Sequence, residues 1–295
     1  MIQINNLTKS YGPNKGVFDL SFQVNEGEVF GFIGPNGAGK TTTIRHLLGF
    51  IHSDSGSCSI MGMDTHDFAA KLQEDIGYLS GEIAFFDQMT GLSFLRLLSE
   101  MRGLINHDRM NELIHFWDLD VSVKIRKMSK GMKQKLGLVS AFMHHPKILI
   151  LDEPTSGLDP LMQTKFVDLI HQEKSKGTTI LMSSHSFEEI ERTCDRAGII
   201  KNGKLVALED IKTLKKEQRK VFMVSLASKS DIEKINSSTL EIVKQKGLDL
   251  EITTYGDINP LIMELSKCKV VSFDLKKQSL EKIFMKYYES GDSNE

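Results

Sequence analysis

The chain has 295 residues, of which 26% are charged, and its formal net charge at pH 7 is −2. This length suffices for one large domain or for a large and a small one, and the balanced charge gives no global positive field that would attract nucleic acid. No apolar stretch approaches the roughly 18 to 20 residues that cross a bilayer, and the N-terminus lacks the apolar core of a secretion signal. We therefore expect a cytosolic chain with reduced cysteines.

The first predicted strand runs from Val17 to Asn25, where apolar and polar side chains alternate. This pattern is typical of a half-buried antiparallel strand. Just before it, Tyr11 stands in a region rich in turn residues. Its ring has two interpretations: a platform on which a nucleotide base stacks, or a half-buried turn residue.

The segment from Gly34 to Thr42, GPNGAGKTT, fits the phosphate-binding pattern G-x-x-x-x-G-K-[ST]. An apolar run, Val29 to Ile33, predicts a buried strand before it, and Ile44, Leu47 and Leu48 have helical spacing after it. In such a loop the glycines let backbone N–H groups turn toward one anion, and the helix N-terminus adds partial positive charge. The sequence therefore predicts a phosphate site between a strand and a helix.

Seven residues of this loop are expected to bind the nucleotide: Asn36, Gly37, Ala38, Gly39, Lys40, Thr41 and Thr42. The ammonium group of Lys40 would reach the β- and γ-phosphates, and the hydroxyl of Thr41 would coordinate Mg²⁺. ATP and Mg²⁺ are thus the predicted substrate and cofactor.

Two apolar stripes with helical spacing follow, from Phe94 to Met101 and from Met110 to Trp117, and Asp108 is the expected N-cap of the second. They predict a helical subdomain inserted before the next catalytic strand. Short apolar runs at Cys58–Met61 and Ile76–Leu79 predict further strands.

A locally basic segment, Lys124 to Lys135, contains the sequence MSKGMKQ. Ser129 is expected to cap the helix that follows. A capped helix N-terminus with a glycine in its first turn can bind an anion, although this signal is weak alone. The segment is therefore either a solvated basic face or a surface that faces phosphate.

The run Ile148 to Leu151 is continuously apolar, as in a parallel strand buried on both faces, and it ends in Asp152 and Glu153. Ligands of α/β sheets bind at the carboxyl ends of the strands. The carboxylate of Asp152 suits Mg²⁺, a hard cation that prefers one or two carboxylates with phosphate oxygens and water. Glu153 would polarise the water that attacks the γ-phosphate.

Pro160 is expected at the first position of a helix that ends near Gly177. The next strand, Thr178 to Ser183, delivers His185 to the same sheet edge as Asp152, where its imidazole could contact the γ-phosphate. Ser186 and Glu189 have the spacing of a capping box for the following helix.

A hairpin from Ile199 to Leu208 closes the first domain, residues 1–208. The polar and basic stretch 209–220 is the expected linker. Residues 221–295 then predict a small α+β domain, with strands at Val221–Leu226, Leu250–Tyr255 and Val270–Leu275 and a terminal helix after Ser279.

Four segments, GPNGAGKTT, MSKGMKQ, ILILDEPTSGLDP and SSHS, occur in the order and at the spacings of the ATP-binding cassette (ABC) ATPases, which residues 1–208 resemble. The resemblance implies an α/β P-loop NTPase fold of the ABC type, with an inserted helical subdomain and an antiparallel N-terminal sheet. The small C-terminal α+β domain would follow it.

The resemblance also implies residue roles. Tyr11 matches the aromatic residue that stacks on adenine, and His185 matches the switch histidine. Ser129, Gly131 and Met132 match the signature that binds the γ-phosphate of ATP held by the other protomer. Asp159 belongs to the loop that couples the two sites of a homodimer.

Two positions depart from the family pattern. The signature has Lys130 where many members have glycine and Met132 where they have glutamine. In the loop after Ile76–Leu79, Gly81 stands where members carry a glutamine that faces Mg²⁺. We expect either that Glu82 replaces that glutamine as a metal ligand or that the contact is absent.

The C-terminal part, which ends in SLEKIFMKYY, looks like the accessory domain of bacterial drug and antibiotic export ATPases. The resemblance thus implies the ATP-hydrolysing subunit of an exporter of drugs, antibiotics or peptides. It would dimerise on ATP and drive a separate multi-span permease, which holds it at the inner face of the cell membrane. The alternatives are a soluble ABC ATPase that acts on the ribosome or on nucleic acid, and a regulatory switch that binds ATP without transport.

Overall fold

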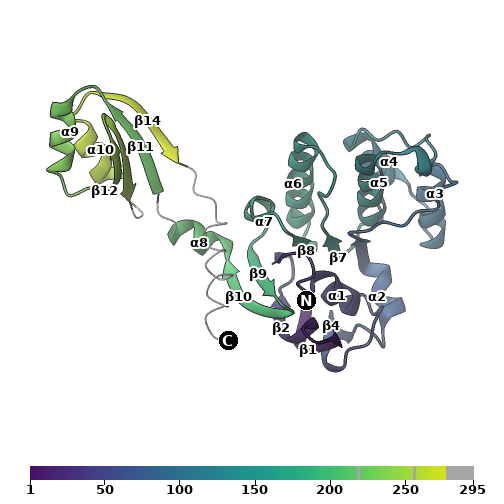
Figure 1. Ribbon diagram of the computed structural model, residues 1–295. Helices are drawn as coiled ribbons and strands as arrows, with labels where there is room; N and C mark the ends of the chain where they lie inside the picture. The colour runs from purple at the N-terminus through teal and green to yellow at the C-terminus, as the bar shows by residue number, and fades with distance from the viewer. Residues whose placement is uncertain (218–219, 255–256, 277–295) are drawn as a thin grey trace. The chain divides into compact units, whose positions relative to one another are not determined.

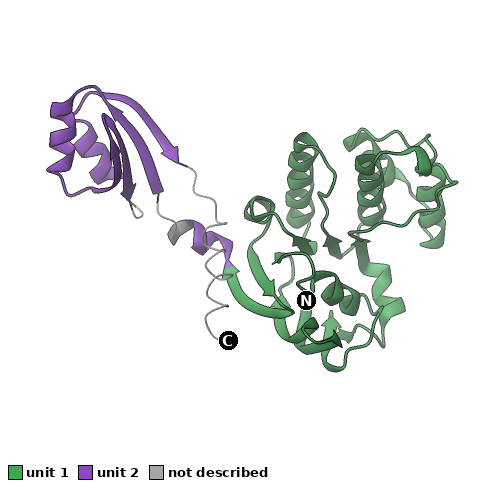
Figure 2. Cartoon of the chain, in the orientation of Figure 1, with its two compact units in different colours: residues 1–209, 294 green, residues 210–293, 295 purple. Residues whose placement is uncertain are grey.

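The protein is described from a computed structural model that places residues 1–217, 220–254 and 257–276. The chain forms two compact units (Figure 2): the first is residues 1–209, and the second begins at Asp210. Each unit has its own apolar core.

The first unit contains a mainly parallel sheet with the strand order β10-β9-β3-β8-β7-β6. Its strands are β3 (Val29–Ile33), β6 (Ile76–Leu79), β7 (Ile148–Asp152), β8 (Thr179–Ser184), β9 (Arg196–Lys201) and β10 (Lys204–Asp210). Every residue of β3, β7 and β8 is buried. A strand covered on both faces needs a continuous apolar run, and this is why these strands were predictable.

The other strands of this unit form an antiparallel sheet with the order β2-β1-β4-β5. It consists of β1 (Ile2–Gly12), β2 (Lys15–Val24), β4 (Ser55–Ile60) and β5 (Met63–Asp64). The sequence did not indicate β1. Its pairing with β2 shifts register after Ile4 and after Leu7, and Asn6 has a φ of 49°. These irregularities interrupt the alternation by which strands are recognised.

Helices flank the sheets of this unit (Figure 1). They are α1 (Lys40–Leu47), α2 (Ala69–Asp75), α3 (Gly91–Met101), α4 (Asp108–Phe116), the 3-10 helix η1 (Ile125–Lys127), α5 (Lys130–Phe142), α6 (Pro160–Ser175) and α7 (Phe187–Thr193). Helices α3 and α4, which correspond to the two helices of the expected helical subdomain, pack against α5, and α5 in turn packs against β6 (Figure 1). Asp108 is not the N-cap of α4, because Asp108 is already helical and the side-chain oxygen of Asn106 accepts its N–H.

The second unit begins with α8 (Ile211–Glu217), which occupies much of the stretch predicted as a linker. It continues as an antiparallel sheet with the order β12-β13-β11-β14. The remaining elements are β11 (Lys220–Leu226), α9 (Lys229–Asn236), β12 (Glu241–Lys246), β13 (Asp249–Thr254), α10 (Asn259–Leu265) and β14 (Val270–Lys276). The helix predicted after Ser279 lies outside the described residues.

Strand β12 was not predicted, because most of its side chains are exposed and polar. Helices α9 and α10 share an apolar core with the sheet of this unit. None of the helices in the described ranges is long and apolar enough to cross a bilayer.

Candidate active site

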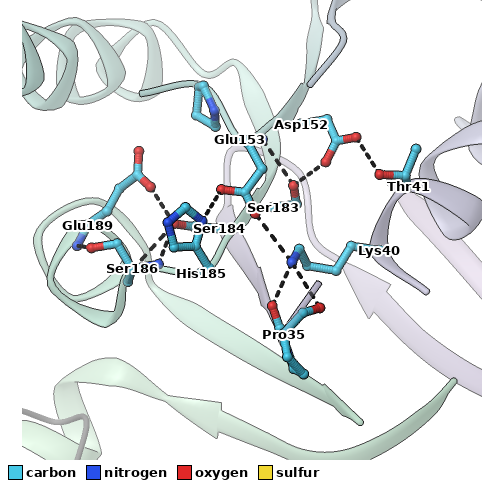
Figure 3. A network of polar contacts seen from close by, with 12 residues as sticks. Pro35, Lys40, Thr41, Asp152, Glu153, Ser183, Ser184, His185, Ser186 and Glu189 are labelled. Atoms are coloured by element: carbon cyan, nitrogen blue, oxygen red, sulfur yellow. Dashed lines mark hydrogen bonds and ion pairs between the residues drawn. The ribbon is translucent and has the colours of Figure 1, made fainter. Parts of the chain in front are cut away.

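The candidate site lies where three parallel strands end. Strand β3 leads into the loop that starts at Gly34, and its neighbour β8 pairs Ser183 with Asp152 of β7. This register places the ends of β3, β7 and β8 at one edge of the sheet, the usual position of ligand sites in such folds. Figure 3 shows the side chains that converge there.

The loop reaches helix α1 through Gly39, which has a φ of 111° in the left-handed region. A Cβ atom at Gly39 would lie 2.7 Å from Val17 Cγ1 of the antiparallel sheet, so both the conformation and the space require glycine. No side chain caps α1. Its first backbone N–H groups are therefore available to an anion.

Lys40 is the first residue of α1 and is 6% exposed. Its Nζ donates to the carbonyl oxygen of Gly34 at 2.5 Å and forms an ion pair with Oε1 of Glu153 at 3.2 Å. These contacts hold a positive charge at the mouth of the loop, where phosphate oxygens would be bound.

Asp152 is 2% exposed and has two hydroxyl partners. Thr41 Oγ1 donates to Oδ2 at 2.7 Å, and Ser183 Oγ donates to Oδ1 (Figure 3). The carboxylate and the Thr41 hydroxyl thus offer adjacent oxygen ligands beside the phosphate loop. Such a donor set fits Mg²⁺, which takes few protein ligands together with phosphate oxygens and water.

Glu153 follows β7 with a φ of 50°, which is uncommon for a residue other than glycine. The backbone N–H of Glu153 donates to the hydroxyl and carbonyl oxygens of Ser183, at 3.1 and 3.2 Å. Its Oε2 lies 2.6 Å from Nδ1 of His185. Strained backbone of this kind gathers at functional sites, where the surrounding structure maintains it.

These groups border a cavity of about 540 Å³. Ten of the site residues predicted from the sequence line this cavity: Asn36, Gly37, Gly39, Lys40, Thr41, Thr42, Glu82, Asp152, Glu153 and His185. A Cβ atom at Gly81 would lie 3.3 Å from Oδ2 of Asp152, so this loop does approach the candidate metal ligands. The side chain of Glu82 is exposed.

Sequence reasoning missed two lining or supporting residues. Arg45 lines the cavity, and the hydroxyl of Ser183 donates a hydrogen bond to Asp152 from the neighbouring strand. Ser156 also lines the cavity; the family resemblance placed it in the coupling loop with Asp159. Helical spacing from Thr41 could have indicated Arg45. Ser183 depends on the register between β7 and β8, which the sequence does not reveal.

Six predicted nucleotide contacts lie outside the lining of this cavity, and five of them, Tyr11, Ser129, Gly131, Met132 and Asp159, come from outside the phosphate loop. Ser129 caps α5 by accepting the N–H of Met132 at 3.2 Å, and Asp159 caps α6 by accepting that of Met162 at 3.0 Å. A Cβ atom at Gly131, in the first turn of α5, would meet the carbonyl oxygen of Gly157 at 3.0 Å. Tyr11 lies near the end of β1 and is 54% exposed.

The buried residue Ala38 also stays outside the lining, although it belongs to the phosphate loop. Its carbonyl oxygen accepts the N–H of Gly203 at 3.0 Å, so this residue attaches the loop to the turn between β9 and β10.

The sequence itself places the chain among known proteins. Residues 17–156 match the profile of the ABC transporter family. The bacitracin transport ATP-binding protein BcrA of Bacillus licheniformis is 34% identical, and the alignment covers 99% of this chain and 98% of the relative. The chain belongs to the ATP-binding proteins of ABC transporters.

Other comparisons agree with this assignment. The linearmycin resistance ATP-binding protein LnrL of Bacillus subtilis is 37% identical over 70% of this chain and 68% of the relative. A solved ATP-binding subunit of an ABC transporter is 31% identical, covers 73% of this chain and 92% of its own, and has a TM-score of 0.67. The dimeric cassette MJ0796 is 23% identical, with a TM-score of 0.64, and shows the fold alone.

Family membership confirms three predictions: the P-loop fold of the ABC type, ATP binding and ATP hydrolysis. The chain is an ABC ATPase. The roles of single residues stay predictions.

Proposed function

We propose that this ABC ATPase is the energy-supplying subunit of an exporter, that it dimerises on ATP and that it drives a separate membrane permease. One observation supports the proposed dimer. The cavity is bordered by Lys40, Asp152, Glu153 and His185, whereas the segment at Ser129 lies outside its lining. A second copy could bring that segment to the nucleotide.

The export function is supported by the relatives. The names of two relatives refer to bacitracin transport and linearmycin resistance, which are functions directed at antibiotics. By family analogy, the permease would contact the inserted helices Leu92–Trp117 and the loop at Gly81 and Glu82, and would hold the ATPase at the inner face of the cell membrane. Exposed apolar side chains at Phe86, Met101 and Ile105 support this choice of surface.

In the proposed reaction, the amide groups of the phosphate loop and the ammonium of Lys40 bind the phosphates of ATP. Asp152 and Thr41 would hold Mg²⁺, which neutralises negative charge on the phosphates when bound. Glu153 accepts a hydrogen bond from the attacking water and takes up its proton. His185 orients the Glu153 carboxylate through the 2.6 Å contact and lies where it can contact the γ-phosphate.

Replacement of Glu153 by Gln tests this proposal. The amide keeps the shape and the contact with His185 but is a poor proton acceptor, so turnover should fall roughly 10²-fold to 10⁴-fold. Binding of ATP should persist, since Lys40 and the loop are unchanged, and the variant should accumulate as an ATP-bound dimer. Turnover is measured by phosphate release, and the dimer by light scattering with and without ATP.

The matched control is Glu188→Gln, because the Glu188 side chain is 81% exposed and lies outside this cavity. It should leave turnover and assembly unchanged. Near-normal turnover in Glu153→Gln would remove the proposed base. A variant that is inactive but stays monomeric with ATP would contradict the proposed dimer.

A further inference from the structure

His185 is held by very little packing. It stands on the short turn between β8 and α7, and its side chain is 68% exposed. The contact with Glu153 therefore depends on how firmly this turn is fixed to the rest of the protein.

A chain of hydrogen bonds fixes the turn (Figure 3). The N–H of Ser186 donates to Ser184 Oγ at 2.9 Å, and Ser184 Oγ donates to Oε2 of Glu189 at 2.5 Å. The N–H of Glu189 in turn donates to Ser186 Oγ at 3.3 Å. The three residues thus form a closed loop of contacts around His185.

This arrangement differs from the predicted capping box. In a capping box the Glu189 carboxylate would accept the backbone N–H of Ser186. Here Ser184 accepts that N–H, and the carboxylate of Glu189 binds Ser184, the last residue of β8. The side chain of Glu189 therefore joins α7 to the strand that presents His185, rather than only starting the helix.

Glu189 is an unfavourable residue to bury at this position. It is 9% exposed, and its carboxyl group is close to the hydroxyl groups of Ser184 and Thr155. The pKa of the Glu189 carboxyl is raised to about 7, mainly by burial and to a smaller extent by the charge of Glu153, while the hydrogen bonds from Ser184 and Thr155 oppose the shift. Buried groups that are perturbed in this way are concentrated at functional sites.

Glu189 also borders a second cavity of about 250 Å³, which it shares with His185, Thr155 and Ser156. Thr155 and Ser156 belong to the segment that follows Glu153. The carboxyl group thus lies between the turn that carries the imidazole and the segment that carries the proposed base.

We propose that Glu189 is a positioning residue for His185: it binds Ser184 and the start of α7, and so holds the imidazole against Glu153. The inference rests on the proposed catalytic roles of Glu153 and His185. Glu189 itself touches neither the phosphate loop nor the candidate metal ligands.

The first test compares Glu189→Ala with Glu189→Gln. The alanine variant loses the acceptor for Ser184, and misplacement of a catalytic group by about 1 Å can reduce kcat by about 100-fold, so we expect a loss of about 10-fold to 100-fold. KM for ATP should change less than about twofold, because Lys40 and the phosphate loop are untouched. The glutamine variant keeps an acceptor and should retain at least about half of kcat.

Glu188→Ala serves as the control on the same helix, because Glu188 is exposed and contacts only Arg192, at 3.9 Å, among the described ion pairs. It should keep full kcat. A merely structural role of Glu189 would instead lower kcat and ATP affinity together, with a matching loss of folded protein in thermal unfolding.

Double variants test whether Glu189 affects turnover through Ser184 and His185. Residues in one network are non-additive, so Ser184→Ala combined with Glu189→Ala should be no slower than the slower single variant. Glu189→Ala should likewise add nothing to His185→Ala. Fully additive losses, or a kcat of Glu189→Ala within twofold of the unmodified protein, would overturn the inference.

A separate readout distinguishes this inference from the proposed function. The imidazole NMR signal of His185, assigned by its absence in His185→Ala, should move in Glu189→Ala and stay in place in Glu188→Ala. An unchanged signal refutes the positioning role whatever the activity. Normal turnover in His185→Ala would refute the catalytic role of His185 while the signal still reports whether Glu189 positions it.

Discussion

Helices α1 and α5 both begin at a segment that the sequence marks as an anion site, yet their surroundings differ. Helix α1 has no side-chain cap, and its first turn faces a cavity shared with Asp152, Glu153 and His185. At α5, the hydroxyl of Ser129 already accepts the N–H of Met132, and this first turn lies outside that lining.

The difference shows that a helix N-terminus alone does not make a phosphate site. At α1, the charged and hydrogen-bonding side chains of the cavity come from segments that are far apart in the sequence. The parallel register of β3, β8 and β7 brings these side chains together. At α5, no comparable groups converge: a Cβ atom at Gly131 would meet the carbonyl oxygen of Gly157 at 3.0 Å, and Ser129 and Gly131 lie outside the lining of that cavity. The contrast is consistent with the proposal that the two segments belong to opposite halves of a composite site.

Among the variants that test this difference between the two helix starts, the largest effect is expected on the α1 side, from Lys40→Ala. The variant loses charge-assisted hydrogen bonds to phosphate, each of which contributes about 1.5 to 3 kcal/mol, so the Kd for ATP should rise at least about 10-fold to 100-fold. Titration with a fluorescent ATP analogue measures this change. Lys71→Ala, at an exposed position of α2, is the control.

An unchanged Kd for ATP and an unchanged hydrolysis rate in Lys40→Ala would contradict the assignment of the α1 cavity to ATP. The cavity at α1 would then not be the nucleotide site, and the difference between the two helix starts would have no bearing on ATP.

A smaller effect is expected on the α5 side, from Ser129→Ala. ATP affinity of the monomer should be unchanged, while turnover should fall about 10-fold, as expected for loss of one hydrogen bond to a charged group. Loss of the N-cap costs about 1 kcal/mol of stability. Thermal unfolding of Ser129→Gly, which costs only a few tenths of a kcal/mol at an N-cap, separates the two effects.

A mixture of Lys40→Ala and Ser129→Ala chains tests whether the α1 and α5 segments act in the same site across a dimer. A dimer of one Lys40→Ala chain and one Ser129→Ala chain contains one composite site with both defects and one with neither. The mixture should therefore hydrolyse ATP faster than either variant alone. A rate equal to the average of the two would show that each chain contains its whole site.

The same contrast explains what could be predicted from the sequence. The phosphate loop and the strands β3, β7 and β8 follow local rules, because a glycine pattern or a buried apolar run identifies each without knowledge of the fold. Family resemblance then added the proposed second half of the site at Ser129, which lies outside the cavity lining.

The residues that were missed depend on contacts between distant segments. Ser183 supports Asp152 and Glu153 only because β7 and β8 align in one register. Glu189 has the spacing of a capping box, but the approach of α7 to β8 directs its carboxylate to Ser184. Strand β1 was missed for a different reason: its register shifts break the alternation that marks a strand.

The smallest expected effect concerns the loop beside the candidate metal ligands, where Gly81 cannot offer a side chain. Glu82 lines the cavity but is exposed. Exposed charges typically contribute about 0.2 to 1 kcal/mol, so Glu82→Ala should lower the rate at limiting Mg²⁺ by no more than about fivefold. Titration of turnover against Mg²⁺ measures this, and Glu100→Ala, an exposed position on α3, is the control.

The shape of that titration decides between the two expectations for the loop. If Glu82 helps to hold Mg²⁺, the variant should need more Mg²⁺ for half-maximal turnover and recover the full rate at saturation. An identical titration would mean that the loop contributes no side chain to the α1 half of the site. The close approach of Gly81 to Asp152 would then serve only the shape of the cavity.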